Sequence, residues 1–323
     1  MEILKYILKR ILSAIPILFI VSIISFFIIR LSPIDPIGEL RLNPAISQET
    51  LDFEIKRLGL DKPVYVQYFY WLKSFVQGDL GVTTSGESVA SRLMERVPNT
   101  LLLSLVVITF TWAIAIPLGI IAAVNRNKWI DKFMTVFTSV GMAVPSFFLA
   151  ILLLILAVKS GLFPTGGLTS YNFAQMNIFQ KILDVMHHLF LPATVLIVIS
   201  IAGLQRQMRG NLLEVLGSDY VKFARAKGLS ENKVIYKHAL RNAINPMITL
   251  LGFEFAGLLS GAALTEYVFQ YPGLGRLVLE AVLKSDINIV MASLMLGTIM
   301  LILGNLFADI LLRLTDPTIG DVK

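Results

Sequence analysis

The chain has 323 residues, of which 55% are hydrophobic and 15% charged, with no cysteine and a net charge of +6. Its mean hydropathy is +0.74. Soluble domains contain about 45–50% apolar and about 25% charged residues, so this composition argues against a soluble enzyme and for a surface in lipid. The lack of cysteine excludes disulfides, thiol nucleophiles and cysteine-based zinc sites.

Six apolar stretches are long enough to cross a bilayer as helices, which takes roughly 20 residues. They are Ile11–Leu31, Pro98–Val124, Phe133–Val158, Leu189–Gln205, Ile244–Val268 and Ile289–Leu312. The first is too long for the core of a signal peptide and lacks a small-residue cleavage site, so we expect it to be a retained helix. The sequence therefore predicts an all-α, polytopic membrane protein with six transmembrane helices.

The basic residues predict the orientation of these spans. With six spans both termini lie on one side, and placing them in the cytoplasm puts most Lys and Arg residues inside, as the positive-inside rule requires. Of the two short outer loops, the first then contains only Lys159 and Lys181 as basic residues, and the second contains only Arg276 and Lys284. We expect cytoplasmic N- and C-termini, and we attribute the positive charge to orientation in the bilayer and not to nucleic-acid binding.

This orientation divides the chain into four parts. Residues 1–31 form a short cytoplasmic segment and the first span, 32–97 an extracytoplasmic loop, 98–315 a core of five spans, and 316–323 a cytoplasmic tail. In the outer loop, the stretch Pro63–Gln77 has apolar and aromatic residues at helical spacing, which predicts an amphipathic helix suited to the membrane interface.

A weaker helical stripe lies earlier in the outer loop. Leu51, Ile55 and Leu58 recur at helical spacing after Ser47, a suitable N-cap, and before Gly59, a suitable stop. Two interpretations of the outer loop remain open at this point. It is either a packed cap over the helical bundle or a docking surface or outer gate for a delivered substrate.

The cytoplasmic loop 206–243 concentrates positive charge and is nevertheless patterned for order. Ser218 and Asp219 can cap a helix that begins at Tyr220 and stops at Gly228, and Ser230 can cap a second helix. Taken alone, the charges could serve the positive-inside rule or bind anionic lipid headgroups.

The same loop carries a family resemblance. Residues 220–230 read YVKFARAKGLS and residues 238–243 read HALRNA, which resembles the cytoplasmic "EAA" loop of ABC importer permeases in the dipeptide/oligopeptide/nickel group. Other segments extend the resemblance over nearly the whole chain. They are GDLG at 78–81, RVPNTL at 96–101, GAALTE at 261–266, PGLGR at 272–276, NL at 305–306 and DP at 316–317.

The resemblance implies a type I ABC importer-like permease without bond chemistry of its own, in a prokaryotic plasma (inner) membrane. It implies a second homologous permease, two cytoplasmic ATPase subunits and an extracytoplasmic substrate-binding protein as partners, besides the lipid bilayer. The chain has no phosphate-binding loop, so we expect no cofactor on it and ATP with Mg on the ATPases. The residues expected to couple to the ATPase are Tyr220, Ala224, Arg225, Ala226, Lys227, Gly228 and Leu229.

A few residues are candidates for the translocation pathway. Glu254 lies well inside a span, where a charge costs about 2.5–3.5 kcal/mol, so we expect it to face the bundle interior. It either lines the pathway, opposite a substrate ammonium or a metal, or makes a structural hydrogen bond. Pro145, with Ser146 beside it, marks either a hinge in the pathway or a kink that membrane helices tolerate.

The sequence leaves other assignments open. The resemblance favours di- and oligopeptides as cargo, with nickel, glutathione or oligosaccharides as alternatives. From a different class, a self-sufficient secondary transporter or channel would use Glu254 as its coupling or selectivity group, and a membrane enzyme or scaffold would be a third reading. His187 and His188 could touch a metal, although a solvated pair at the membrane interface is the simpler expectation.

Overall fold

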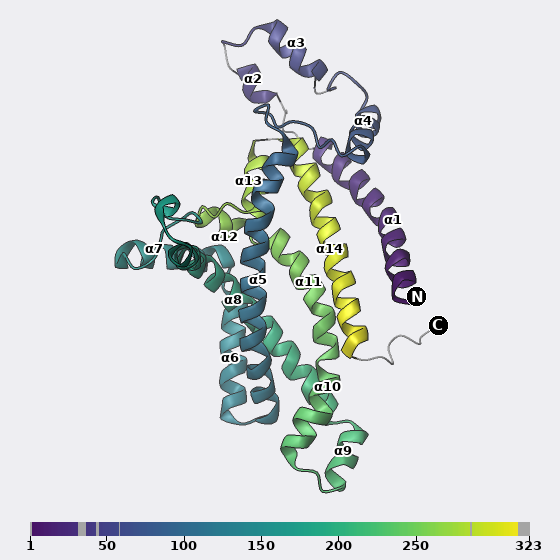
Figure 1. The fold of residues 1–323 in the computed structure, drawn as a ribbon, viewed down its shortest axis with the longest axis vertical. Helices are drawn as coiled ribbons and strands as arrows, with labels where there is room; N and C mark the ends of the chain where they lie inside the picture. The colour runs from purple at the N-terminus through teal and green to yellow at the C-terminus, as the bar shows by residue number, and fades with distance from the viewer. Residues whose placement is uncertain (1, 32–36, 43–44, 58, 285, 316–323) are drawn as a thin grey trace.

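The computed structural model describes residues 2–31, 37–42, 45–57, 59–284 and 286–315. Within these ranges the chain is helical, and its only β-type pairing is an isolated bridge between Val82 and Ser88. Four helices are much longer than the others, namely α1 (Glu2–Leu31), α5 (Val89–Val124), α8 (Ile178–Leu216) and α14 (Ile287–Thr315). Among them, α5 and α14 run along the length of the molecule (Figure 1).

These four helices contain apolar segments long enough to cross a membrane, namely Ile7–Leu31, Val89–Val124, Ile178–Leu216 and Ile287–Ile310. A bent pair, α6 (Trp129–Ala143) and α7 (Ser146–Ser160), adds a fifth crossing if it counts as one span. The sixth stretch corresponds to α11 (Asn245–Gly261), whose 17 residues extend about 26 Å. The count of six spans stays a prediction.

The predicted span Phe133–Val158 is divided at the expected disturbance by Pro145, and the break is sharper than a kink. The axes of α6 and α7 differ by 92°, and α7 lies across the direction of α5 and α6 (Figure 1). Pro145 causes this break because it has no N–H to donate and forces the residue before it out of the helical region. Val144 accordingly has extended angles, with φ −86° and ψ 120°.

A second predicted span, Ile244–Val268, is also divided. Helix α11 ends at Gly261, and a short helix α12 (Ala263–Val268) follows after Ala262. Glycine is a weak helix former, which favours an interruption there. Helix α11 begins at Asn245, with Ile244 in the cap position. Helix α13 (Leu274–Leu283) comes next in the chain.

Two helices extend beyond their apolar stretches. Pro98, the first residue of the predicted span Pro98–Val124, and Pro192, near the start of Leu189–Gln205, lie inside α5 and α8. Polar flanks can remain helical because a helix ends where its backbone groups find other partners and not where its side chains become polar. Thus α8 begins at Ile178, well before the predicted start at Leu189. The side chain of Asn177, its N-cap, forms a capping box with Gln180.

The outer segment forms three helices, α2 (Gly38–Leu42), α3 (Gln48–Arg57) and α4 (Val64–Val76). The amphipathic helix predicted over Pro63–Gln77 is confirmed, and so is the weaker helix after Ser47, whose Oγ accepts from the Thr50 N–H at 3.2 Å. Gly59 has a φ of +65°, which suits a residue that ends a helix.

Helix α4 packs on the membrane helices through aromatic side chains. Tyr68 is buried with Phe26 of α1 and Met291 of α14, and its hydroxyl lies 2.9 Å from Ser22 Oγ. At least this part of the outer segment is therefore a packed cap on α1 and α14. Helices α2 to α4 occupy one end of the molecule, and the start of α1 and the end of α14 are directed toward the other (Figure 1).

Candidate functional site

The predicted coupling segment lies at the opposite end of the molecule from α2 to α4 (Figure 1). It consists of α9 (Asp219–Ala226), the π-helix η2 (Lys233–Ala239) and α10 (Leu240–Ala243). The predicted helix up to Gly228 is confirmed within one or two residues, and Gly228 has a φ of +78°. Ser218 does stand in the N-cap position, but its hydroxyl donates back to the Val215 carbonyl instead of capping α9.

One face of the coupling segment is buried against the rest of the protein. Val221 and Ala224 of α9 pack with Val234 of η2 and with Met208 and Leu212 of α8. The same core continues through residues of α5 and α11. Because protein cores are close-packed and stiff, α9 is mechanically joined to these long helices. A displacement of α9 would therefore move them with it.

The other face of the coupling segment is exposed and carries aromatic and basic residues. Phe223 and Tyr236 are 62% and 59% exposed. The Lys227 ammonium lies 4.7 Å from the centre of the Phe223 ring. Both aromatic residues were missed as site residues, although an aromatic residue on a basic helix face is itself a signal of an interface. This face combines apolar and positively charged contacts.

Arg225 is held within the chain. Its guanidinium makes two hydrogen bonds to the Glu231 carboxylate, at 2.6 and 3.2 Å. The hydrogen bonds from Arg225 lower the pKa of Glu231, against a smaller opposing effect of burial. The pair fixes the turn around Gly228, because it connects the end of α9 to Glu231, two positions before η2 begins.

The predicted coupling residues are thus divided between two roles. Ala224 is only 8% exposed and faces the core of the protein, so its small size serves the packing of α9. Ala226 and Lys227 lie on the exposed face. Leu229 is half-buried in the same core, and the Tyr220 hydroxyl accepts a 2.7 Å hydrogen bond from Asn242.

A buried ion pair near the coupling segment was not found from the sequence. Asp131 of α6 is 3% exposed and accepts two hydrogen bonds from Arg209 of α8, at 2.6 and 2.8 Å. It also accepts from the Asn127 N–H at 2.9 Å. The bidentate geometry fixes the start of α6 to α8. No local sequence signal pairs residues that are 78 positions apart.

Two of the three predicted pathway residues share a cavity. Glu254 of α11 and Ser146 of α7 line a space of about 270 Å³ together with Thr111 of α5 and Ser200 of α8. Pro145 directly precedes Ser146 as the N-cap of α7. The break in the helix thus brings the polar start of α7 to the cavity that Glu254 lines.

Hydrogen bonding in this cavity is incomplete. The Glu254 carboxylate accepts one bond, from Trp112 Nε1 at 2.7 Å. The Thr111 hydroxyl is buried without a hydrogen-bond partner. Glu254 therefore makes a hydrogen bond to the neighbouring helix α5 and also lines an internal space, and its place on the translocation pathway stays a prediction. Buried polar groups are normally hydrogen-bonded, so the unpaired hydroxyl favours a ligand or water in this space.

The sequence analysis overlooked a second buried carboxylate, Glu266 of α12, which is fully buried. It accepts from the backbone N–H of Arg276 at 2.8 Å and contacts Thr100 Oγ1 at 3.4 Å. Thr100 Oγ1 in turn accepts from the Leu274 N–H at 2.7 Å. Because Gly273 has no side chain to cap α13, Glu266 takes that role from another helix.

The expectation of a solvated histidine pair holds for His187, which is exposed, and fails for His188. His188 is buried, and its Nδ1 lies 2.9 Å from the Asp184 carbonyl oxygen. His187 Nε2 lies 2.9 Å from the Leu162 carbonyl oxygen. Both rings are thus engaged with the backbone. In the part of the chain that the structure describes, no group of three or more His, Asp or Glu residues is placed to hold a metal.

Comparison with known proteins places these features in a family. Residues 115–321 match the binding-protein-dependent transport system inner membrane component, and residues 3–106 match the N-terminal part of such membrane components. The chain is 42% identical to the oligopeptide transport system permease protein AppB of Bacillus subtilis, over 97% of this chain and 98% of that protein. It is 35% identical to the glutathione transport system permease protein GsiC of Escherichia coli K12, over 98% of this chain and 99% of that protein.

A solved structure shares the fold. A chain of the inward-facing MetNI methionine ABC transporter superposes with a TM-score of 0.55 at 17% identity, and the match covers 70% of this chain and 97% of that one. The fold is that of an ABC importer permease, and the protein is a membrane transport subunit. It belongs to the family of binding-protein-dependent transport system inner membrane components. This assignment replaces the alternatives of a self-sufficient transporter, a channel, a membrane enzyme or a scaffold.

Proposed function

We propose that this chain forms one half of the translocation pathway of an ATP-driven peptide importer in a prokaryotic plasma membrane, with a second homologous permease forming the other half. The observation that carries this proposal is the 42% identity to an oligopeptide permease along 97% of the chain. An extracytoplasmic binding protein would deliver the peptide, and two cytoplasmic ATPase subunits would supply the energy with ATP and Mg. In this arrangement the termini and α9 lie in the cytoplasm.

The exposed face of α9 and η2 is the proposed contact with an ATPase. Phe223 and Tyr236 would insert as apolar anchors, and Lys227 would add a charged contact beside them. Closure of the nucleotide-bound ATPases would push α9, and the shared core would transmit this push to α5, α8 and α11 as a rigid-body tilt.

The cavity beside Glu254 is the proposed part of the pathway within this chain. A carboxylate with only one hydrogen bond and a buried free hydroxyl can bind a cationic donor, and the terminal ammonium of a peptide is such a donor. The half-helix start at Ser146 adds backbone N–H groups on the same cavity.

Glutathione is the second candidate cargo, because a glutathione permease is 35% identical over nearly the full length of this chain. Nickel and oligosaccharides remain alternatives that only the family resemblance suggests. The cargo can be identified after the chain is purified from its native membrane together with its partner subunits. Reconstitution of that assembly with its binding protein would then allow uptake of labelled oligopeptide and labelled glutathione to be compared.

We expect two ATPase subunits and a second permease to copurify, and ATP-dependent uptake of oligopeptides to exceed that of glutathione. A chain that purifies alone and transports without ATP would refute the importer proposal. Uptake of glutathione in preference to oligopeptides would leave the importer proposal intact and make glutathione the cargo.

The role of Glu254 can be tested separately with Glu254→Gln, which keeps an oxygen for the Trp112 bond and removes the charge. Uptake of peptides with a free amino terminus should fall about tenfold, since a hydrogen bond to a charged group contributes about 1.5–3 kcal/mol. Uptake of N-acetylated peptides should not change. Glu214→Gln, at an exposed position of α8, is the matched control. Equal effects on both peptide types would contradict a contact with the ammonium.

A further inference from the structure

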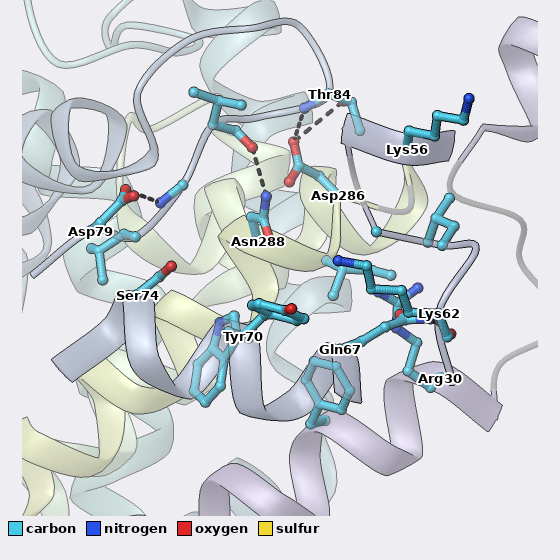
Figure 2. A pocket seen from close by; sticks show the side chains of 18 residues that line it. Arg30, Lys56, Lys62, Gln67, Tyr70, Ser74, Asp79, Thr84, Asp286 and Asn288 are labelled. Atoms are coloured by element: carbon cyan, nitrogen blue, oxygen red, sulfur yellow. Dashed lines mark hydrogen bonds between the residues drawn. The ribbon is translucent and has the colours of Figure 1, made fainter. Parts of the chain in front are cut away.

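A pocket of about 380 Å³ lies where the end of α1 meets the outer helices and the start of α14 (Figure 2). Its walls come from segments far apart in the sequence. Arg30 is at the end of α1. Lys62 lies two residues before α4, and Gln67 is in the first turn of α4. Asp79 and Asp286 come from connecting segments. The proposed transport function uses none of these residues.

One side of the pocket is positively charged, and its two basic side chains contact aromatic rings instead of carboxylates. The Lys62 ammonium lies 4.2 Å from the centre of the Tyr70 ring, and the Arg30 guanidinium carbon lies 5.5 Å from that of Phe26. Figure 2 shows Arg30, Lys62 and Gln67 together on this side. In the described part of the chain, neither Arg30 nor Lys62 forms an ion pair, and Arg30 Nε is buried without a hydrogen-bond partner. Gln67 donates to the Lys62 carbonyl at 2.7 Å, which helps to fix the Lys62 backbone. Arg30 is half-buried, and a guanidinium with a buried N–H that has no acceptor is costly, so this side is suited to an anion.

The opposite side of the pocket is negatively charged (Figure 2). Asp286 is 4% exposed and accepts from the N–H groups of Thr84 at 2.8 Å and Ile289 at 3.2 Å. Asp79 accepts from the Gly81 N–H at 2.9 Å. Neither carboxylate is paired with a basic side chain among the described residues. The pocket therefore separates unpaired positive from unpaired negative charge, which suits a zwitterionic ligand.

The position of the pocket indicates the source of that ligand. Arg30 is the next-to-last residue of the apolar segment Ile7–Leu31, so it lies where a hydrocarbon core would give way to lipid headgroups. Phe26, Tyr70 and Trp71 also line the pocket. Aromatic rings are typical of this level of a membrane, as are long basic side chains near helix ends.

We propose that this pocket binds the phosphoethanolamine headgroup of a phospholipid. The phosphate lies between Arg30 and Lys62, and the primary ammonium is directed toward Asp286. A glycerol headgroup has no ammonium for the acidic side, and a choline headgroup has no N–H donors. The bound lipid joins the end of α1 to α4 and to the residues before α14.

The test uses the full permease assembly in nanodiscs that contain equal amounts of phosphatidylethanolamine, phosphatidylglycerol and phosphatidylcholine. Lipids retained after transfer to detergent are measured by native mass spectrometry. We expect phosphatidylethanolamine to be enriched about tenfold, because each charged contact changes affinity by about that factor. Arg30→Gln and Lys62→Gln should each abolish this enrichment. Lys73→Gln removes the same charge at an exposed position of α4 outside the pocket and should leave it unchanged.

A further variant separates the two ends of the headgroup. Asp286→Asn keeps an oxygen that accepts from the Thr84 N–H, and it should reduce the preference for phosphatidylethanolamine over phosphatidylglycerol while total retained lipid stays constant. Equal enrichment in Lys62→Gln and Lys73→Gln would overturn the proposal, as would equal retention of the three lipids by the unaltered protein. Displacement of the lipid by inorganic phosphate or by a dipeptide would assign the pocket to those ligands instead.

Discussion

Glycine at position 273 is required by the Glu266 carboxylate. A Cβ on residue 273 would lie 2.4 Å from the carboxylate atoms, which is closer than such atoms approach in proteins. The carboxylate itself cannot move away easily, because it accepts from the Arg276 N–H and contacts Thr100 Oγ1. These contacts connect α5, α12 and α13 at a point where each helix alone would leave polar groups unpaired.

We expect Gly273→Ala to lower the free energy of unfolding by about 1–3 kcal/mol, the usual cost of forcing extra atoms into a packed site. The measurement is the melting temperature of the purified assembly in detergent. Gly210→Ala in α8 is the control, because a Cβ there meets no atom within 4 Å and the residue is helical. A melting temperature that is the same for both variants would show that the Glu266 contacts do not constrain this turn.

Gly228 differs from Gly273 because its surroundings are open. A Cβ would meet nothing within 4 Å, but the φ of +78° is unfavourable for residues with side chains. We expect Gly228→Val to uncouple ATP hydrolysis from transport, because its strain of about 1–2 kcal/mol would displace α9 from the ATPase. Gly228→Asn should remain coupled, since asparagine tolerates this conformation.

The quantity to measure for Gly228 is the number of peptides transported per ATP hydrolysed in proteoliposomes. The permease variants must first be shown to insert and to copurify with the ATPases. A ratio for Gly228→Val equal to that of the unaltered protein would remove Gly228 from the coupling segment.

At the scale of elements, the ion pair between Asp131 and Arg209 joins two helices that sequence analysis treats separately. We expect Asp131→Asn to cost about 1.5–3 kcal/mol, because Arg209 would lose a charged partner in a largely buried position. Chemical or thermal unfolding of the assembly would report this loss. Lys222→Ala, which breaks an exposed pair with Asp219, should give no measurable change. A double variant with Arg209→Ala would show whether the two single effects are coupled.

The break at Pro145 shows which features of the structure a single residue predicts and which it does not. The proline predicts a disturbance of the helix, and the extended angles of Val144 follow from it. The 92° turn and the position of Ser146 beside Glu254 do not follow, because several bend angles satisfy the same local rule. Contacts of α7 with α8 and α12 select one of them.

At the scale of the whole molecule, cysteine labelling can test the orientation in the membrane, because the chain has no cysteine of its own. Tyr171→Cys lies between α7 and α8 at an exposed position, and Lys128→Cys lies at an exposed position between α5 and α6, outside the proposed ATPase contact. With cytoplasmic termini, an impermeant maleimide should label Tyr171→Cys in intact cells and Lys128→Cys only after permeabilisation. The isolated unaltered chain gives no background, since it has no thiol. Labelling of Lys128→Cys in intact cells would reverse the topology.

Features that depend on nearby residues were predictable from the sequence. The amphipathic α4, the cap at Ser47 and the stop near Gly228 follow from side-chain spacing and from the conformational preferences of single residues. The family resemblance also came from the sequence, because it rests on contiguous motifs. The apolar composition indicated the membrane, since water and lipid select different surfaces.

Only the tertiary structure decided which distant residues meet. Glu266 was overlooked because its partners on α13 and α5 are brought to it by folding. Ala224 was assigned to an external contact, although α8 covers its side of α9. The ligand pocket at Arg30 likewise combines four separate segments. Local periodicity determines helices and their apolar faces, whereas buried polar contacts depend on the relative positions of helices, which only packing of the whole chain determines.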